Sequence, residues 1–291
     1  MILIHELKTT SEDIAPGSTY WRRLTLDSQV SGYLAAAHAL GYDAAGVQYD
    51  VIRKTGLRGK QNETPDSYEQ RIVQQIAEEP DRYFGRGVIV RTEAEIAEHA
   101  ADVWQVAELI RAARSSNRWP RYVGACMTYN TPCDYWAVCA EGGDIEGPLY
   151  KTSPPMTGAR LPVLSASALN TWRQCPRKYY YSQELRRRRV SGESKPLWFG
   201  KLIHNAVQVY NASGSADQAM AIVSDCADAM DRAHGRALMR GYTARWVPLK
   251  MLATEQQFNM PMVNPDTGAS SRTFECGGFV DGIVEVENGQ I

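Results

Sequence analysis

The sequence contains no long hydrophobic run. No stretch of about 18 apolar residues, the length at which a segment becomes a candidate membrane span, occurs in the chain. The apolar opening, residues 1–4, is followed at once by His5 and Glu6, which makes it too short for a secretory signal peptide. We therefore expect a soluble globular protein with a cytoplasmic location and no membrane partner.

The chain also lacks an excess of charge of either sign. Its 32 Lys and Arg residues are balanced by 33 Asp and Glu residues, which gives a net charge of −1. This balance argues against a protein that coats nucleic acid with its whole surface, but it permits a local basic groove. With 291 residues, of which 44% are hydrophobic, the chain can bury one large core or two modest ones.

Disulfides are not expected, because the chain has no export signal and its six cysteines are unevenly spaced. Three cysteines fall within 14 residues, and a fourth follows 36 residues later. These four could form one metal site: Cys126, Cys133, Cys139 and Cys175. Partly buried free thiols are an alternative. The two isolated cysteines, Cys226 and Cys276, are interpreted as structural.

Hydrophobic spacing predicts alternating strands and helices. Strands are expected at 2–8, 46–52 and 279–287. Helices are expected at 21–40, at 93–113, from Ser165 or Ser167 onward, at 199–210 and through much of 215–238. A polar loop is expected at 54–66, followed by a further helix that ends at about residue 79. The glycine- and proline-rich segment 145–163 has the composition of a linker, so it separates residues 1–144 from residues 164–291.

The two ends of the chain complete each other. Asn288 and Gly289 have the composition of a two-residue hairpin turn that follows a strand. A hairpin needs a returning strand, and the apolar segment 1–8 can supply it. Writing the ends together gives two apolar-rich strands around a tight turn.

This pairing would create a catalytic group. Side chains alternate across a strand, so Glu6 and Lys8 share one face, which Asp281 on the neighbouring strand can share. Asp, Glu and Lys together can carry out metal-dependent hydrolysis of phosphodiester bonds. A Glu-x-Lys pair by itself is more often a solvated surface pair.

In one cyclic order, the motifs resemble those of the PD-(D/E)xK nuclease superfamily, in particular its RecB/AddB-like and CRISPR-associated iron–sulfur exonucleases. In family order the matching segments are 164–181, 199–204, 278–281, 6–9, 27–33 and the cysteine triplet. The resemblance implies an α/β, restriction-endonuclease-like core, with a mixed central sheet flanked by helices, a helical cap and a four-cysteine cluster lobe. The order would be circularly permuted: residues 1–144 would be the family's C-terminal half and 164–291 its N-terminal half, both in one nuclease domain.

The resemblance also assigns roles at the metal site. Asp281 and Glu6 would be the acidic ligands of Mg²⁺ or Mn²⁺, with His204 and the Leu7 carbonyl as further ligands. Lys8 would lie beside the attacking water. Such ions prefer oxygen ligands, lower the pKa of bound water and neutralise charge on the phosphate. Without the flanking motif, His204 would be interpreted as a structural histidine.

Gln29 and Tyr33 match the family's Q-x3-Y motif, which follows the catalytic strand. The resemblance implies that they position the substrate or the catalytic lysine. Their four-residue spacing places them on one face of a helix. The alternative is that they are ordinary helix-surface and core residues.

The cysteine set resembles the frame that holds a [4Fe–4S] cluster in the AddB-like branch, where one ligand precedes the nuclease core and three follow it. Cys175 would be the first ligand, and Cys126, Cys133 and Cys139 the others. The gap between Cys126 and Cys133 is longer than the C-x2-C of those relatives. Thiolates also suit zinc, so Zn²⁺ is the alternative cofactor.

The strongest basic cluster lies within residues 173–189. Its members, expected to bind DNA, are Arg173, Arg177, Lys178, Arg186, Arg187, Arg188 and Arg189. Four aromatic residues are interleaved with them: Trp172, Tyr179, Tyr180 and Tyr181. Positive charge can neutralise phosphates, and aromatic rings can stack on unpaired bases. The alternative is a solvated helix face with buried tyrosines.

The sequence therefore predicts a divalent-metal-dependent deoxyribonuclease of DNA repair or recombination. An exonuclease acting on single-stranded DNA or duplex ends is expected rather than an endonuclease. Its partners would be DNA and a helicase or recombination protein. Two alternatives of other classes are a noncatalytic iron–sulfur or zinc-containing DNA-binding scaffold and a zinc-stabilised RNA-processing protein.

Overall fold

The structure, a computed structural model, describes residues 1–128, 130–156, 158–190 and 194–286. Its internal contacts divide the chain into two compact units. Unit 1 comprises Met1–Arg91, Glu193–Gln256 and Phe279–Ile291, and unit 2 comprises Thr92–Gly192 and Gln257–Gly278. Each unit therefore joins segments that are far apart in the sequence.

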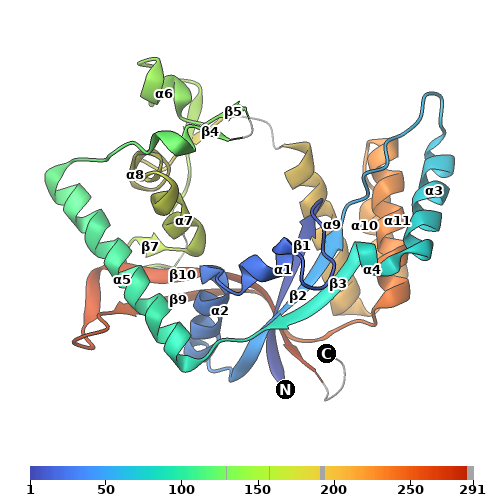
Figure 1. The fold of residues 1–291 in the computed structure, drawn as a ribbon, viewed down its shortest axis with the longest axis horizontal. Coiled ribbons are helices and arrows are strands. Elements are labelled where there is room, and N and C mark those ends of the chain that lie inside the picture. The colour runs from blue at the N-terminus through green and yellow to red at the C-terminus, as the bar shows by residue number, and fades with distance from the viewer. Residues whose placement is uncertain (129, 157, 191–193, 287–291) are drawn as a thin grey trace. The chain divides into compact units, whose positions relative to one another are not determined.

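Unit 1 contains a mixed sheet with helices packed on it (Figure 1). Its strands lie in the order β3-β2-β1-β10. Strand β1 is parallel to β2 and antiparallel to β10, and β3 is antiparallel to β2. The elements that lie wholly in this unit are β1 (Ile2–Thr10), α1 (Thr19–Leu24), α2 (Ser28–Ala39), β2 (Ala44–Arg53), α3 (Pro65–Glu78), α4 (Pro80–Tyr83), β3 (Phe84–Ile89), α9 (Lys195–Ser213), α10 (Ala216–Ser224) and α11 (Ala229–Arg245).

The first strand of the chain pairs with the last one. Ile2 lies opposite Glu285 and His5 lies opposite Gly282, in antiparallel register. The expected pairing of the two ends is therefore present, and β1 and β10 lie side by side in Figure 1. The predicted turn at Asn288 and Gly289 lies outside the described residues.

The two faces of β1 have different neighbours. Leu7 belongs to a buried core that includes Ile52 of β2 and Phe84 of β3, together with residues of α3, α9, α10 and α11. Because side chains alternate along a strand, Glu6 points to the opposite face. There it meets Gln29 of α2.

Unit 2 has its own core, built mainly from α5 and α7. Buried residues such as Ile110, Leu169 and Phe274 pack together there. The elements that lie wholly in this unit are α5 (Glu93–Ser116), η1 (Val123–Ala125), β4 (Met127–Thr128), β5 (Thr131–Pro132), α6 (Trp136–Ala140), β6 (Tyr150–Thr152), β7 (Val163–Leu164), α7 (Ala166–Gln174), α8 (Pro176–Tyr179), η2 (Tyr180–Glu184) and β8 (Arg187–Arg189).

Two long strands take part in both units. They are β9 (Lys250–Val263) and β10 (Ser270–Glu285), which pair with each other. In unit 2, β10 also pairs with β7 in parallel, with Glu275 opposite Val163. Within the described part of the chain, no helix has both the length and the apolar character needed to span a bilayer.

The expectation of one continuous helix over 21–40 is wrong. The chain forms α1 and α2 instead, and the break lies at residues 25–27. Asp27 ends the continuity because its carboxylate accepts a hydrogen bond from the Gln29 backbone N–H at 2.8 Å. This is an N-cap, which starts a new helix.

The segment 145–163, expected to be a linker, contains β6 and the first residue of β7. Strand β6 is only three residues long and is held by pairing with β8, where Thr152 lies opposite Arg187. Glycines and prolines around it obscure so short a strand in the sequence. Residues 187–189 therefore form a strand, so the alternative of a helix face is wrong for them.

Candidate active site

Glu6 and Lys8 project from the same face of β1. Glu6 is almost fully buried, at 2% exposure, whereas the Lys8 side chain is 39% exposed. The Lys8 ammonium forms an ion pair with Glu6 Oε1. The other carboxylate oxygen, Oε2, is buried and has no hydrogen-bond partner among the described residues. One half of the carboxylate is thus open to a further ligand.

Helix α2 holds the bonded oxygen of this carboxylate. Gln29 Nε2 donates to Glu6 Oε1 at 3.2 Å and also contacts the Tyr33 hydroxyl. Asp27 starts the helix, and this fixes Gln29 in its first turn. Burial, together with the nearby Glu6 charge, raises the pKa of Tyr33 above its usual range, so the phenol stays neutral. The Q-x3-Y residues therefore fix the orientation of Glu6.

Asp281 and His204 approach β1 from other elements. Asp281 Oδ2 accepts a hydrogen bond from the Leu7 backbone N–H at 3.1 Å and lies 3.5 Å from His204 Nε2. His204 is carried by α9, which packs closely on β1. A Cβ atom added at Gly200 would lie only 2.9 Å from Thr9 Oγ1. The glycine permits this close approach.

The site concentrates negative charge. Burial, together with the charge of Asp281, raises the pKa of Glu6 to about 7 against the opposing effect of Lys8. The pKa of Lys8 is itself raised, because its attraction to the Glu6 carboxylate outweighs burial of its ammonium. Two neighbouring carboxylates and one orphaned oxygen favour a cation, since positive charge relieves both the repulsion and the burial cost.

The predicted ligands are neighbours, but they are not arranged as a finished metal site. No group of three or more His, Cys, Asp or Glu side chains among the described residues is placed to hold a metal ion. The contacts of Glu6 and Asp281 explain why these two carboxylates do not converge on one point. Glu6 is turned toward Lys8 and Gln29, whereas Asp281 is turned toward Leu7 and His204.

One comparison with known proteins gives a result. Residues 163–276 match the model of the PD-(D/E)XK nuclease superfamily. The match begins at β7, includes His204 of α9, continues through β9 and ends in β10 before Asp281. It covers less than half of the 291 residues. No curated protein and no solved structure matches the chain.

The superfamily match supports a metal-dependent nuclease, and such nucleases typically use Mg²⁺ or Mn²⁺. The mixed sheet flanked by helices is consistent with a restriction-endonuclease-like fold. The iron–sulfur branch and the permuted order stay predictions. Three further expectations also stay predictions: exonuclease activity, a role in repair or recombination, and a helicase partner.

All four predicted cluster cysteines lie in unit 2, and none of them forms a disulfide. Cys133 and Cys139 pack beside one group of buried tyrosines, and the Cys133 backbone N–H donates to the Cys126 carbonyl at 2.8 Å. Cys175 is buried at the end of α7. Burial raises the pKa of the Cys133 thiol. The predicted cluster stays a prediction.

The predicted DNA-binding side chains also lie in unit 2. Arg173 is on α7, Arg177 and Lys178 are on α8, and Arg186 directly precedes β8, which holds Arg187, Arg188 and Arg189. Several of them are engaged locally: Arg177 Nε donates to the Trp119 carbonyl at 2.8 Å, Lys178 Nζ donates to Gln174 Oε1 at 3.2 Å, and Arg187 pairs with Glu146. Arg188 and Arg189 are exposed.

Stacking of bases on the interleaved aromatic residues is wrong for three of the four. Trp172, Tyr179 and Tyr181 are buried. Trp119 stacks on Tyr179 and Tyr180, with ring centroids 6.3 and 5.0 Å apart. Aromatic rings in a packed core are stabilised by their neighbours and have no free face on which a base of a DNA strand could stack. Of the four rings, only that of Tyr180 is not buried.

A buried polar network behind β1 was missed in the sequence. Asp50 is fully buried and accepts hydrogen bonds from Arg86 Nε at 2.6 Å, from Arg86 Nη2 at 2.7 Å and from the Tyr242 hydroxyl at 2.7 Å. His5 Nε2 lies 3.2 Å away. Burial would raise the pKa of Asp50, but hydrogen bonds from His5 and Arg86 hold it below its usual range. The sequence feature that could have revealed this network is an aspartate, Asp50, within the mainly apolar run 47–52.

Proposed function

We propose that this chain is a divalent-metal-dependent deoxyribonuclease that hydrolyses phosphodiester bonds, an exonuclease on single strands or duplex ends rather than an endonuclease. The observation that carries the proposal is the meeting of Glu6, Lys8, Asp281 and His204 at the β1–β10 pair. These four side chains come from three elements. If packing were their only purpose, apolar residues would serve it better.

The residues fit a divalent ion of the Mg²⁺ or Mn²⁺ type. Glu6 Oε2 has no partner among the described residues, and Asp281 offers a second carboxylate. The Leu7 N–H is directed at Asp281, and the carbonyl of a strand residue points to the same side as its N–H. Glu6, Asp281, Leu7 and His204 would hold the ion. When bound, it would lower the pKa of a water molecule and neutralise phosphate charge.

The chain's own groups have distinct tasks in this proposal. Lys8, whose ammonium now pairs with Glu6, would orient the attacking water beside the phosphate. Gln29, in contact with the Tyr33 hydroxyl, holds Glu6 Oε1 and leaves Oε2 available to a ligand. His204 Nε2 lies 3.5 Å from Asp281 Oδ2, close enough for both atoms to serve one ion.

Cleavage of labelled DNA tests the proposal. Wild-type protein with Mg²⁺ or Mn²⁺ is expected to shorten linear single-stranded or duplex DNA and to leave closed circles intact. Addition of EDTA is expected to stop the cleavage. Lys8→Ala is expected to lose about 100-fold or more of the cleavage rate, as when a group acting on the reacting water is removed, with DNA binding retained.

A noncatalytic DNA-binding scaffold is the second candidate. The observation that favours it is that the Glu6 carboxylate is turned toward Lys8 and Gln29, while Asp281 is turned toward Leu7 and His204. Wild-type protein that binds DNA normally but leaves every linear substrate intact would establish the scaffold.

We also propose that Cys126, Cys133, Cys139 and Cys175 hold a [4Fe–4S] cluster, with Zn²⁺ as the alternative. Their common location in unit 2 and the packing of Cys133 and Cys139 beside the same tyrosines support this. The exposed arginines of β8, in the same unit, would contact DNA phosphates.

A further inference from the structure

A groove of about 430 Å³ lies in unit 1 beside the proposed catalytic residues. It is lined by the end of β1, by Lys54 directly after β2, and by the first half of α9. Its volume falls within the range of about 300–1,000 Å³ that is usual for ligand sites. Lys8 and His204 both line it, so the groove opens onto the proposed centre.

The titratable side chains that line the groove, apart from His204, are lysines. Lys8, Lys54 and Lys201 line it, and no aspartate or glutamate does so among the residues that the structure describes. Lys54 has no carboxylate oxygen within 4.0 Å of its ammonium in the described ranges, although it is partly buried. Burial lowers the pKa of Lys54. A partly buried ammonium without a counter-charge is stabilised when an anion binds beside it.

The first turn of α9 adds to this character. The helix is 19 residues long and has no acidic side chain in its first turn. Its N-cap residue, Ser194, lines the groove and makes no side-chain capping hydrogen bond. The amino end of a helix carries partial positive charge, which favours phosphate. Gly200 keeps this helix close to Thr9 of β1, so one wall of the groove is fixed against the other.

We propose that this groove binds the phosphate backbone of a nucleic-acid strand next to the bond that is cut, with Lys54 and Lys201 as phosphate-contacting residues. The proposal rests on the proposed nuclease function for its placement at the catalytic centre. Lysines contact phosphates as point charges and do not read bases, so binding here is independent of sequence.

Binding measured without catalysis tests the proposal. A fluorescein-labelled oligothymidylate is titrated with protein in EDTA, and fluorescence anisotropy gives the Kd over a range of salt concentrations. Lys54→Gln is expected to raise the Kd about fivefold near 0.1 M salt and to reduce the slope of log K against log salt by about 0.7, the value for one phosphate contact on a single strand. Lys54→Arg is expected to restore both.

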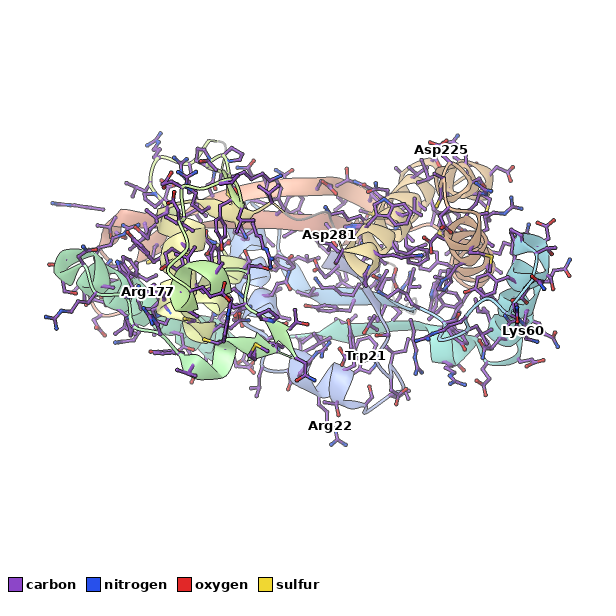
Figure 2. The ribbon with its side chains drawn as sticks, turned by 90° about the horizontal axis from the view of Figure 1, so that it is seen from above. Trp21, Arg22, Lys60, Arg177, Asp225 and Asp281 are labelled. Atoms are coloured by element: carbon purple, nitrogen blue, oxygen red, sulfur yellow. The ribbon has the colours of Figure 1, made fainter. Side chains whose placement is uncertain are left out.

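Lys60→Gln is the matched control. Lys60 is an exposed lysine of the same unit, and Figure 2 shows it well away from Asp281. Its replacement is expected to leave the Kd and the salt slope unchanged.

Three results would overturn the proposal: no binding by wild type at low salt, an equal effect of the two glutamine substitutions, or an unchanged Kd and slope for Lys54→Gln. Displacement of the oligonucleotide by an equal concentration of thymidine monophosphate would also overturn it, because that indicates a nucleotide pocket. If wild type binds in EDTA but does not cleave with Mn²⁺, the nuclease proposal fails while the backbone groove stands.

Discussion

Glu6 is the residue whose chemistry depends most on its surroundings. Its carboxylate is buried between Lys8 and Gln29, with one oxygen unpartnered among the described residues. Burial raises its pKa to about 7 from the ordinary 4.5. Folding therefore favours the protonated form, and the stabilisation from this proton is present below about pH 4.5 and is lost as the pH rises through about 7.

Metal binding at Glu6 should depend on pH in the opposite direction. An ion must displace the proton, so we expect the apparent Mn²⁺ affinity to fall by up to about tenfold for each pH unit below 7 and to level off above it. Isothermal titration calorimetry between about pH 5 and pH 9 measures this. Glu6→Gln should abolish the binding, whereas Glu12→Gln, at an exposed carboxylate paired with Arg23, should change nothing. A flat profile across pH 7 would exclude Glu6 as a ligand.

At the scale of elements, the contact between α9 and β1 determines where His204 lies. Gly200→Ala places a methyl group 2.9 Å from Thr9 Oγ1, so the Thr9 side chain or the helix must move. We expect a loss of about 1–3 kcal/mol in the free energy of unfolding, offset in part by a gain of about 1 kcal/mol in helix propensity. Cleavage should fall as well, because His204 lies one turn further along the same helix.

Denaturant unfolding of a double-mutant cycle checks this contact. In a Thr9→Ala background the obstacle is gone, so Gly200→Ala is expected to stabilise the protein by up to about 1 kcal/mol. The sign of the effect should thus reverse between the two backgrounds. Equal effects in both would show that Thr9 does not limit the approach of α9.

The sequence predicts elements with strong periodicity and misses those without it. Alternation along 2–8 and the four-residue spacing of Gln29 and Tyr33 place these residues as the structure has them. Strand β3 was not found, because Gly85 and Gly87 lie against the Trp21 ring and leave no apolar pattern.

Strand β9 was missed for another reason. Most of its side chains are at least partly exposed, so it shows no sustained apolar alternation and is held by pairing with β10. Lys54 could not be predicted either. It is a single lysine after a strand, and only the packing of α9 gives it a role.

At the scale of the whole molecule, the candidate chemistry is divided between the two units. The proposed nuclease centre lies in unit 1, and the four proposed cluster cysteines lie in unit 2, together with the partly buried Cys276. Each unit has a separate hydrophobic core. Loss of a metal cluster should therefore act first on unit 2, and Mn²⁺ binding at Glu6 and Asp281 can report on unit 1 separately.

We expect protein purified without oxygen to be brown and to contain iron. Cys175→Ala is expected to lower the iron content and the thermal stability, because a bound cluster stabilises the folded form by mass action. Elemental analysis and thermal unfolding measure both. Cys276→Ala is the control: burial raises the pKa of this thiol to about 11, so it stays protonated and is a poor ligand, and the iron content should not change. Zinc without colour would assign the four thiolates to a zinc site. Wild-type protein with neither metal would show that they are free thiols, and the region around Cys133 and Cys139 would then be held by packing of its tyrosines rather than by a metal.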